Sequence, residues 1–198
     1  DENMTWAENL VGFIIQRVLD NCNMELLNLE RDIEKLKTIV PPFPRITYDD
    51  AAQILKDSGS DFKYGSDFGA PDEALLSAHF DKPIMIHRWP ADIKAFYMKR
   101  DKENNHLALG VDMIATDGYG EIIGGGQRED DLNILIDRIR HHDLPLKPFQ
   151  WYLDLRRYGS VPHSGFGLGL ERTVAWICGT KHIRETIPFP RTMSRLEP

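Results

Sequence analysis

The stretch GFGLGLER, residues 165–172, alternates glycine with apolar residues and then places Glu171 and Arg172 side by side. The alternation predicts a strand over 165–168, and a helical pattern follows over 171–178. Glycine lets a backbone approach a flat or phosphorylated ligand, and arginine is a planar cation that stacks on bases or binds phosphate. Taken alone, however, the pattern is more simply explained by a glycine-rich strand packed tightly against a neighbour.

Two common nucleotide-binding patterns do not fit this stretch. A Walker A loop needs a lysine followed by Ser or Thr, which is not found here. The dinucleotide fingerprint needs a parallel strand-helix-strand unit, and its spacing is also missing. If the stretch binds a nucleotide, it does so in another way.

A second group of candidate residues lies in GEIIGGGQRED, residues 120–130. Three glycines leave the backbone bare between Glu121 and Arg128, so both side chains could face one cleft. Glu121 is suited to hold a hard cation such as Mg²⁺, and Arg128 to grip a carbonyl, carboxylate or phosphate. The alternative is a β-bulge or tight turn with a surface ion pair.

The rest of the chain predicts an α+β fold in which helices flank an antiparallel sheet. Thr47 is a plausible N-cap with Asp49 and Asp50 in the first turn behind it. The strands follow one another too closely for parallel crossovers, so they should pair mainly as hairpins. No internal repeat or domain boundary is evident. By periodicity and composition we expect helices over 3–20, 24–37, 48–56, 73–76, 130–142, 149–158 and 171–178, and strands over 83–89, 93–100, 107–115, 120–126 and 165–168.

Composition limits the class of protein. With 41% hydrophobic and 28% charged residues, the chain has the make-up of an ordinary globular domain. A net charge of -7 argues against a tight non-specific nucleic-acid binder, although it does not exclude a tRNA partner. Cys22 and Cys178 have no metal-binding spacing and predict buried thiols. We expect a cytoplasmic protein that has no membrane-spanning segment.

Together, in this order, the two groups of residues resemble the class II aminoacyl-tRNA synthetases of the aspartyl, asparaginyl and lysyl subgroup. Residues 169–172 match the end of motif 3, the ATP-binding motif of that class. Glu121, the glycines 124–126 and Arg128 match the subgroup's metal-binding Glu, its Gly-rich turn and its amino-acid-binding Arg. The resemblance implies the class II catalytic fold, an antiparallel sheet flanked by helices.

Further segments are similar to asparaginyl-tRNA synthetases in particular, so the resemblance covers nearly the whole chain. The segment IKAFYM over 93–98 is similar in sequence to asparaginyl-tRNA synthetases. After Phe-Pro-Arg the chain has TMSR over 192–195, where aspartyl enzymes have another pattern. The segments over 151–152, 158–165 and 183–191 are also similar in sequence to asparaginyl-tRNA synthetases. The group that would distinguish an amide from a carboxylate is not identifiable from the sequence, so aspartyl-tRNA synthetase stays open.

The resemblance also implies roles for single residues. Glu121 would hold Mg²⁺, and Arg128 would orient the amino acid, with Gly124 beside it. ATP would lie against Gly169, Leu170, Glu171 and Arg172. The implied reaction is the ATP-dependent activation of asparagine and its transfer to tRNA(Asn). Arg172 and Arg128 would be the catalytic residues.

Residues 1–198 would then be the last part of a class II catalytic domain. Its start resembles the segment after motif 2, so motifs 1 and 2 and the anticodon-binding OB-fold domain would lie outside it. The full enzyme would be a homodimer joined through motif 1, and the 198 residues alone should not charge tRNA. Two other functions stay open, a synthetase-like asparagine synthetase and a non-catalytic module derived from a synthetase.

Overall fold

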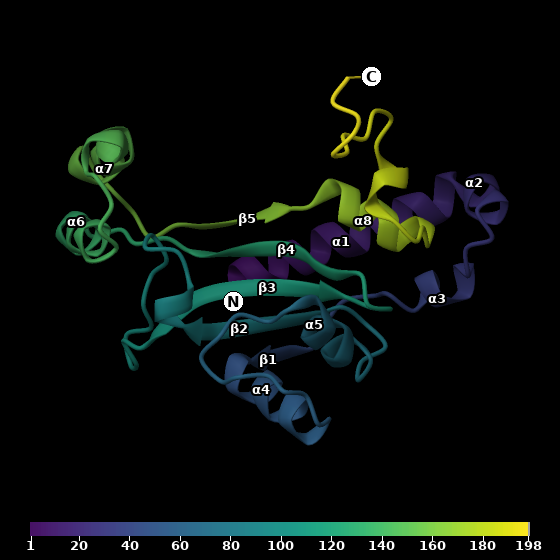
Figure 1. The fold of residues 1–198 in the computed structure, drawn as a ribbon, viewed down its shortest axis with the longest axis horizontal. Coiled ribbons are helices and arrows are strands. Elements are labelled where there is room, and N and C mark those ends of the chain that lie inside the picture. Colours follow the sequence, from purple (N-terminus) through teal and green to yellow (C-terminus); the bar gives the residue numbers. More distant parts are fainter. Residues whose placement is uncertain (198) are drawn as a thin grey trace.

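The computed structural model describes residues 1–197, and its centre is a five-stranded sheet with the strand order β1-β2-β3-β4-β5 (Figure 1). β1 pairs with β2 in parallel, and the other neighbours are antiparallel. This agrees with the predicted α+β fold. The strands are β1 (Arg45–Thr47), β2 (Ile84–Pro90), β3 (Leu107–Ala115), β4 (Gly120–Gln127) and β5 (Ser164–Leu168).

Helices cover both faces of this sheet. The helices are α1 (Glu2–Asn21), α2 (Asn23–Asn28), α3 (Ile33–Lys37), α4 (Tyr48–Asp57), α5 (Ala70–Ser77), α6 (Leu132–His141), α7 (Gln150–Arg157) and α8 (Leu170–Cys178), with 3₁₀ turns η1 (Ala91–Ile93), η2 (Lys147–Phe149) and η3 (Ile183–Thr186). None of the helices over 1–197 is long and apolar enough to cross a membrane.

The core has three parts. On one face α1 and α8 pack on the sheet through Met4, Val11 and Trp176. On the other face α4 and α5 pack through Tyr48, Leu55 and Leu76 onto Ile84, Ile86 and Ile114 of β2 and β3. A smaller cluster holds α6 and α7 together through Leu135, Ile139 and Leu153. Successive apolar side chains of β2 and β3 point to opposite faces of the sheet, so these strands contribute to the core on both faces.

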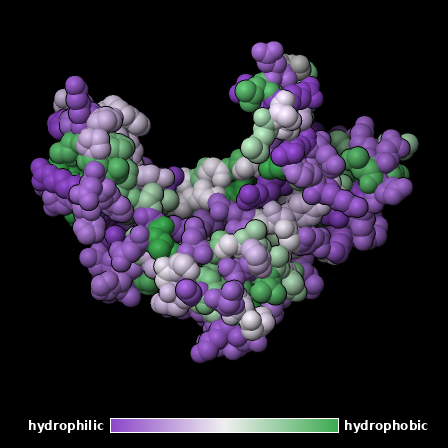
Figure 2. All heavy atoms as spheres, in the orientation of Figure 1, coloured by the Kyte–Doolittle hydropathy of each residue, from purple (hydrophilic) through white to green (hydrophobic). Residues whose placement is uncertain are grey.

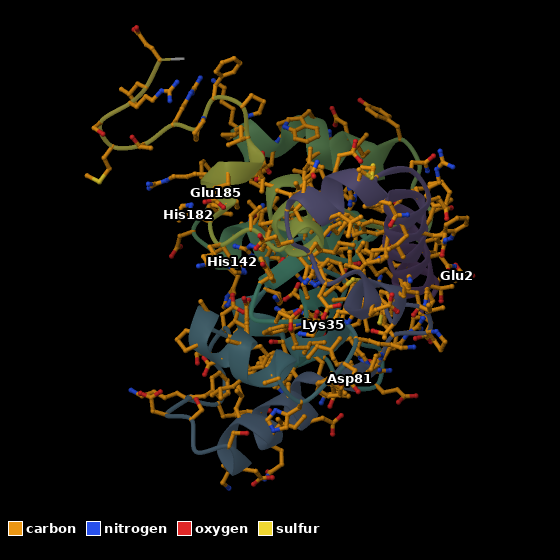
Figure 3. All side chains as sticks on the ribbon, turned by 90° about the vertical axis from the view of Figure 1, so that its right-hand side faces the viewer. Glu2, Lys35, Asp81, His142, His182 and Glu185 are labelled. Carbon is orange, nitrogen blue, oxygen red and sulfur yellow. The ribbon has the colours of Figure 1, made fainter. Side chains whose placement is uncertain are left out.

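The molecule is hollowed along one side. Figures 1 and 2 show α6 and α7 rising at one end of the sheet and the C-terminal segment at the other, with the β5 side open between them. The view turned by 90° shows the chain beyond Glu185 running away from the body of the molecule (Figure 3). The strand that floors the hollow is the glycine-rich β5.

Most predicted elements are confirmed within a residue or two. Thr47 caps α4 as predicted: its side-chain oxygen accepts from the Asp50 backbone N–H, and the Asp50 carboxylate accepts from the Thr47 backbone N–H. Two predictions are wrong, and one short strand was missed. The helix over 24–37 is broken between α2 and α3, where Glu30 takes a positive φ of 54°. The three-residue β1 was not predicted.

The strand predicted over 93–100 does not form. The segment begins in η1 and then makes only two isolated bridges, from Met98 to Arg128 and from Arg100 to Ala108. Phe96 and Tyr97 pack instead against the α6–α7 cluster. Aromatic residues favour strands because they fit a half-buried surface, and here the surface they fit is helical.

Candidate functional site

A bulge in β4 decides which side chains share a face. Met113 pairs with Ile123 and the next β3 residue, Ile114, pairs with Glu121, so Ile122 is the extra residue. Strict alternation would place Glu121 and Gly124 on opposite faces, whereas the bulge returns them to the same one. Asp112 faces that side too, because it pairs directly with Gly124. This is the face that α4 and α5 cover further along.

Two carboxylates meet over Gly124. A Cβ added at this glycine would lie 2.5 Å from Glu121 Oε1 and 3.6 Å from Asp112 Oδ1. Burial raises the pKa of Asp112, and the Lys94 ammonium partly opposes this. Burial, followed by the nearby charge of Asp112, raises the pKa of Glu121 to about 7. The glycine is therefore needed for space, and the two acids form one negative site.

Glu73 adds a third carboxylate from α5. It accepts a hydrogen bond from the Glu121 backbone N–H at 3.2 Å, and burial raises its pKa. A Cβ at Gly120, where φ is 76°, would lie 2.5 Å from Glu73 Oε2. The turn before β4 thus holds Glu73 against the strand that carries Glu121.

Arg172 lies at the first turn of α8, beside these acids. Its Nη1 donates to the Glu121 carbonyl oxygen at 2.6 Å. Gly169 caps α8 and its N–H donates to the Ile122 carbonyl oxygen at 2.8 Å. The backbone bond of Gly169 at the start of α8 and the side-chain bond of Arg172 therefore both fix the arginine beside β4.

A cavity of about 270 Å³ collects most of the predicted site. It is lined by Glu121, Ile122, Gly124, Gly167, Gly169, Glu171, Arg172 and Ile183. Five of the predicted residues, those at 121, 124, 169, 171 and 172, therefore lie together. Leu170 does not line the cavity, and it is 64% exposed.

Arg128 lies apart from this cavity, beyond the end of β4. Its guanidinium lies over the Tyr97 ring at 5.1 Å, and Nη1 is 3.3 Å from Met98 Sδ. From Gly124 to Arg128 is about 13 Å along a strand. The two residues share a face, because four positions separate them. The structure thus gives an elongated surface with acids and Arg172 at one end and Arg128 at the other.

The buried Glu129 braces the Arg128 end of this surface. Its carboxylate is 1% exposed and pairs with Lys99 at 2.7 Å and with Arg138 of α6 at 2.9 Å. Arg156 of α7 donates to the Glu129 carbonyl oxygen at 2.9 Å. Removing one partner of such a buried network is strongly destabilising. The α6–α7 pair is thus fastened to the strand beside Arg128.

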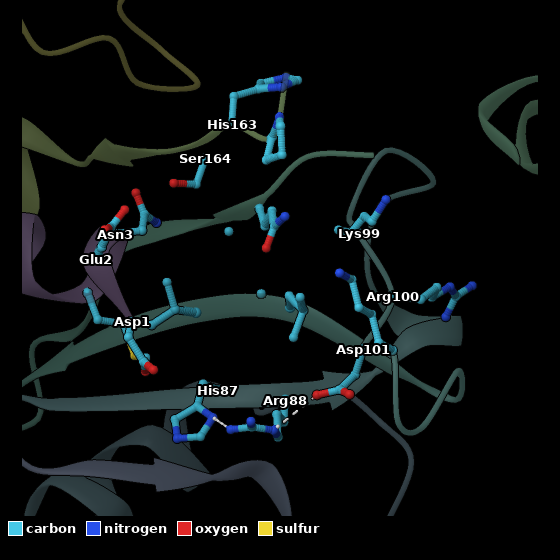
Figure 4. Close-up of a pocket in the computed structure, with 18 of the residues that line it drawn as sticks. Asp1, Glu2, Asn3, His87, Arg88, Lys99, Arg100, Asp101, His163 and Ser164 are labelled. Atoms are coloured by element: carbon cyan, nitrogen blue, oxygen red, sulfur yellow. Dashed lines mark hydrogen bonds and ion pairs between the residues drawn. The ribbon is translucent and has the colours of Figure 1, made fainter. Parts of the chain in front are cut away.

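A larger cavity lies elsewhere. Its volume is about 580 Å³, and it lies beside the first residues of α1, next to Val111 on the α1 side of the sheet. Figure 4 shows His87, Arg88 and Asp101 at one edge of it, joined by the interactions drawn. None of the predicted site residues lines it. Size alone therefore does not mark the site in this molecule.

Asp112, Glu73 and Lys94 are site residues that the sequence does not single out. They come from β3, α5 and the segment after η1, and only the fold brings them to β4. One signal was available for Asp112. It is the only charged residue in the apolar strand LALGVDMIA, and a lone acid inside a buried strand needs a partner or a function.

Comparison with known proteins assigns the family. The profile of the tRNA synthetases class II (D, K and N) matches residues 1–193. The chain belongs to this family. The asparagine--tRNA ligase of Pelotomaculum thermopropionicum is 58% identical over 198 residues, which is 100% of this chain and 46% of that protein. The chain therefore spans less than half the length of this curated relative.

Solved structures of class II synthetases support the same family assignment. The asparaginyl-tRNA synthetase of Pyrococcus horikoshii complexed with asparaginyl-adenylate matches with a TM-score of 0.95 and 49% identity, over 98% of this chain and 45% of that one. An aspartyl tRNA synthetase from Entamoeba histolytica matches with a TM-score of 0.88 and 30% identity, over 100% of this chain and 41% of that one. The fold and family predictions are confirmed, and the asparaginyl relative is the more similar in sequence.

Proposed function

We propose that this chain is the C-terminal part of the catalytic domain of an asparagine--tRNA ligase. The enzyme would react asparagine with ATP, giving asparaginyl adenylate and pyrophosphate, and then transfer the asparaginyl group to tRNA(Asn) with release of AMP. The likeness to a synthetase complexed with asparaginyl-adenylate carries this proposal. The elongated surface from Arg172 to Arg128 supports it, because an adenylate has a nucleotide at one end and an amino acid at the other.

In the first step a carboxylate oxygen of asparagine attacks the α-phosphorus of ATP, and the bond to pyrophosphate breaks. Catalysis of this kind depends mainly on positioning and on stabilising charge. We assign Arg172, with Gly169, Leu170 and Glu171, to the nucleotide. Arg172 is already aimed by its bond to the Glu121 carbonyl, so little order needs to be gained on binding. Arg128 would hold the side-chain oxygen of asparagine, with Gly124 leaving room between the two ends.

Glu121 and Asp112 fit a Mg²⁺ site. They are hard oxygen donors that meet over a glycine whose Cβ would fill the space between them. Over residues 1–197 no group of three or more His, Cys, Asp or Glu side chains is arranged to hold a metal ion. Mg²⁺ commonly binds through one or two carboxylates together with substrate phosphates. When bound, the ion would neutralise charge on the phosphates of ATP.

ATP–pyrophosphate exchange tests this function. The full-length enzyme that carries this chain should support exchange with asparagine and far less with aspartate. Preference for aspartate would make it an aspartyl enzyme. Formation of free asparagine from aspartate, ATP and ammonia would make it an asparagine synthetase. No exchange with either amino acid, together with ATP binding, would support a non-catalytic module.

The remaining expectations belong to the full-length enzyme. We propose that it is a cytoplasmic homodimer whose partner surface is supplied by motif 1. Sedimentation of the full-length protein would show a single species of twice the chain mass, whereas a monomer would contradict the proposal.

A further inference from the structure

Lys94 is a nearly buried cation inside the acidic part of the site. Its Nζ lies 2.5 Å from Asp112 Oδ2, and the two side chains are only 14% and 10% exposed. The same Nζ lies 3.7 Å from the centroid of the Trp89 ring. Trp89 is 1% exposed and its own N–H donates to the Ile86 carbonyl oxygen. The indole is therefore fixed, and it holds the lysine in place by a cation–π contact.

This ion pair leaves the two oxygens of Asp112 in different surroundings. Lys94 donates a hydrogen bond to Oδ2, whereas Oδ1 is turned toward Gly124 and the carboxylate of Glu121. The positive charges of Lys94 and Arg172 both act on Glu121, and Arg172 donates its hydrogen bond to a carbonyl oxygen rather than to a carboxylate. Lys94 is thus the cation that directly pairs with an acid of the site.

The charges here would otherwise favour a bare metal ion. Asp112, Glu121 and Glu73 place up to three negative charges close together in a partly buried site, where charge interactions are stronger than in water. A lysine paired with one of them removes one charge and occupies one donor oxygen. A divalent cation that arrives with phosphate oxygens needs fewer protein donors than a bare one.

We propose that Lys94 is a positioning residue that acts as a resident counter-cation of Asp112 and makes divalent-metal binding depend on the nucleotide. It orients Asp112 so that one oxygen faces Glu121, and it competes with a bare metal ion for the other. This inference rests on the proposed metal role of Asp112 and Glu121. A purely structural lysine would stabilise the fold without affecting metal affinity.

The test measures Mn²⁺ binding without nucleotide, by the loss of the free-ion electron paramagnetic resonance signal. In the full-length protein, Lys94→Met should bind Mn²⁺ on the order of tenfold more tightly than the wild type, because one nearby positive charge is gone. Lys94→Gln keeps a donor for Asp112 and should show the same tightening. Lys94→Arg keeps the charge and should bind as the wild type does.

Lys35→Met is the matched control. Lys35 forms a comparable pair with Asp117 at 2.6 Å, but on the surface, where its side chain is 58% exposed. This variant should leave Mn²⁺ affinity unchanged. Unchanged or weaker Mn²⁺ binding in Lys94→Gln would overturn the inference. This variant decides the test even if Lys94→Met fails to fold. ATP–pyrophosphate exchange by the wild type, measured separately, decides the proposed function and does not depend on this result.

Discussion

Glu121 is the residue whose protonation should be visible in stability. Its pKa is raised to about 7, above the ordinary value of 4.5, chiefly by burial. A raised carboxyl pKa means that the folded state binds the proton more tightly than the unfolded state does. The stability that the protonated Glu121 carboxyl contributes is present in full below about pH 4.5 and is lost as the pH rises through about 7. The ionised Glu121 is thus a cost that the free protein bears at neutral pH.

We predict that Glu121→Gln stabilises the protein at pH 8, because it removes this ionisation. Allowing for partial exposure to solvent, the gain should be about 1 kcal/mol, and it should shrink toward pH 5. Thermal denaturation in a chelator, without nucleotide, measures it. Glu34→Gln is the control, since Glu34 is in an exposed pair with Lys37. Equal melting temperatures for wild type and Glu121→Gln at pH 8 would contradict the burial argument.

Arg172 should matter for activity and little for folding. It is exposed, and among residues 1–197 its side chain makes one hydrogen bond, to the Glu121 carbonyl oxygen. We predict that Arg172→Ala lowers ATP–pyrophosphate exchange by about 100-fold, the usual effect of losing one charge-stabilising donor. The exposed Arg17 of α1 provides the control, and Arg17→Ala should exchange normally. Normal exchange by Arg172→Ala would refute the nucleotide assignment.

At the scale of elements, the glycines of the paired strands β4 and β5 differ in how much space their surroundings leave for a side chain. A Cβ at Gly125 would lie 2.6 Å from both the Gly165 carbonyl oxygen and Phe166 Cβ, so β5 packs directly on it. A Cβ at Gly165 in β5 meets nothing within 4 Å. The first glycine is therefore required for pairing of β4 with β5.

We predict that Gly125→Ala destabilises the protein by about 1–3 kcal/mol, as expected for overpacking. Gly165→Ala should change the free energy of unfolding by less than about 0.5 kcal/mol. Urea denaturation of the two variants gives the comparison. If both variants lost stability equally, the close approach of the strands would not be the cause.

The long, periodic elements could be predicted from the sequence, and the irregular ones could not. α1, β3 and α8 follow from their apolar spacing, because burying one face is what selects the element. β1 is only three residues long and pairs in parallel with a strand far along the chain, so no local pattern marks it. The β4 bulge, which brings Glu121 round to Gly124, arises from pairing with β3 and is also invisible locally.

The site divides in the same way. Glu121, Gly169 and Arg172 lie beside glycines that local sequence displays, and the fold does bring them into one cavity. Lys94 is in a segment that resembles an ordinary aromatic strand, and the only local sign of Asp112 is that it is a single charge within an apolar strand. Their role depends on a contact across 18 residues that forms only when the segment after η1 folds over Trp89. Chemistry assembled from distant segments needs the structure.

At the scale of the whole molecule, the nucleotide end of the site is open. Its cavity is about 270 Å³, below the range of about 300–1,000 Å³ in which ligand pockets enclose most of a small molecule. β5, which carries the glycine stretch, is an edge strand among the described residues. The curated relative from Pelotomaculum thermopropionicum is more than twice as long as the part that this chain matches. We infer that further residues supply the opposite wall.

We therefore predict that the 198 residues alone do not charge tRNA. Without a second wall ATP keeps most of its water, and groups that would stabilise charge on its α-phosphate are not fixed around it. Aminoacylation of tRNA(Asn) by the purified chain should stay at background, whereas a fusion of the chain to the remaining part of the Pelotomaculum relative should charge it. Charging by the 198 residues alone would show that one wall suffices. An inactive but folded fusion, judged by cooperative unfolding, would place the fault within this chain instead.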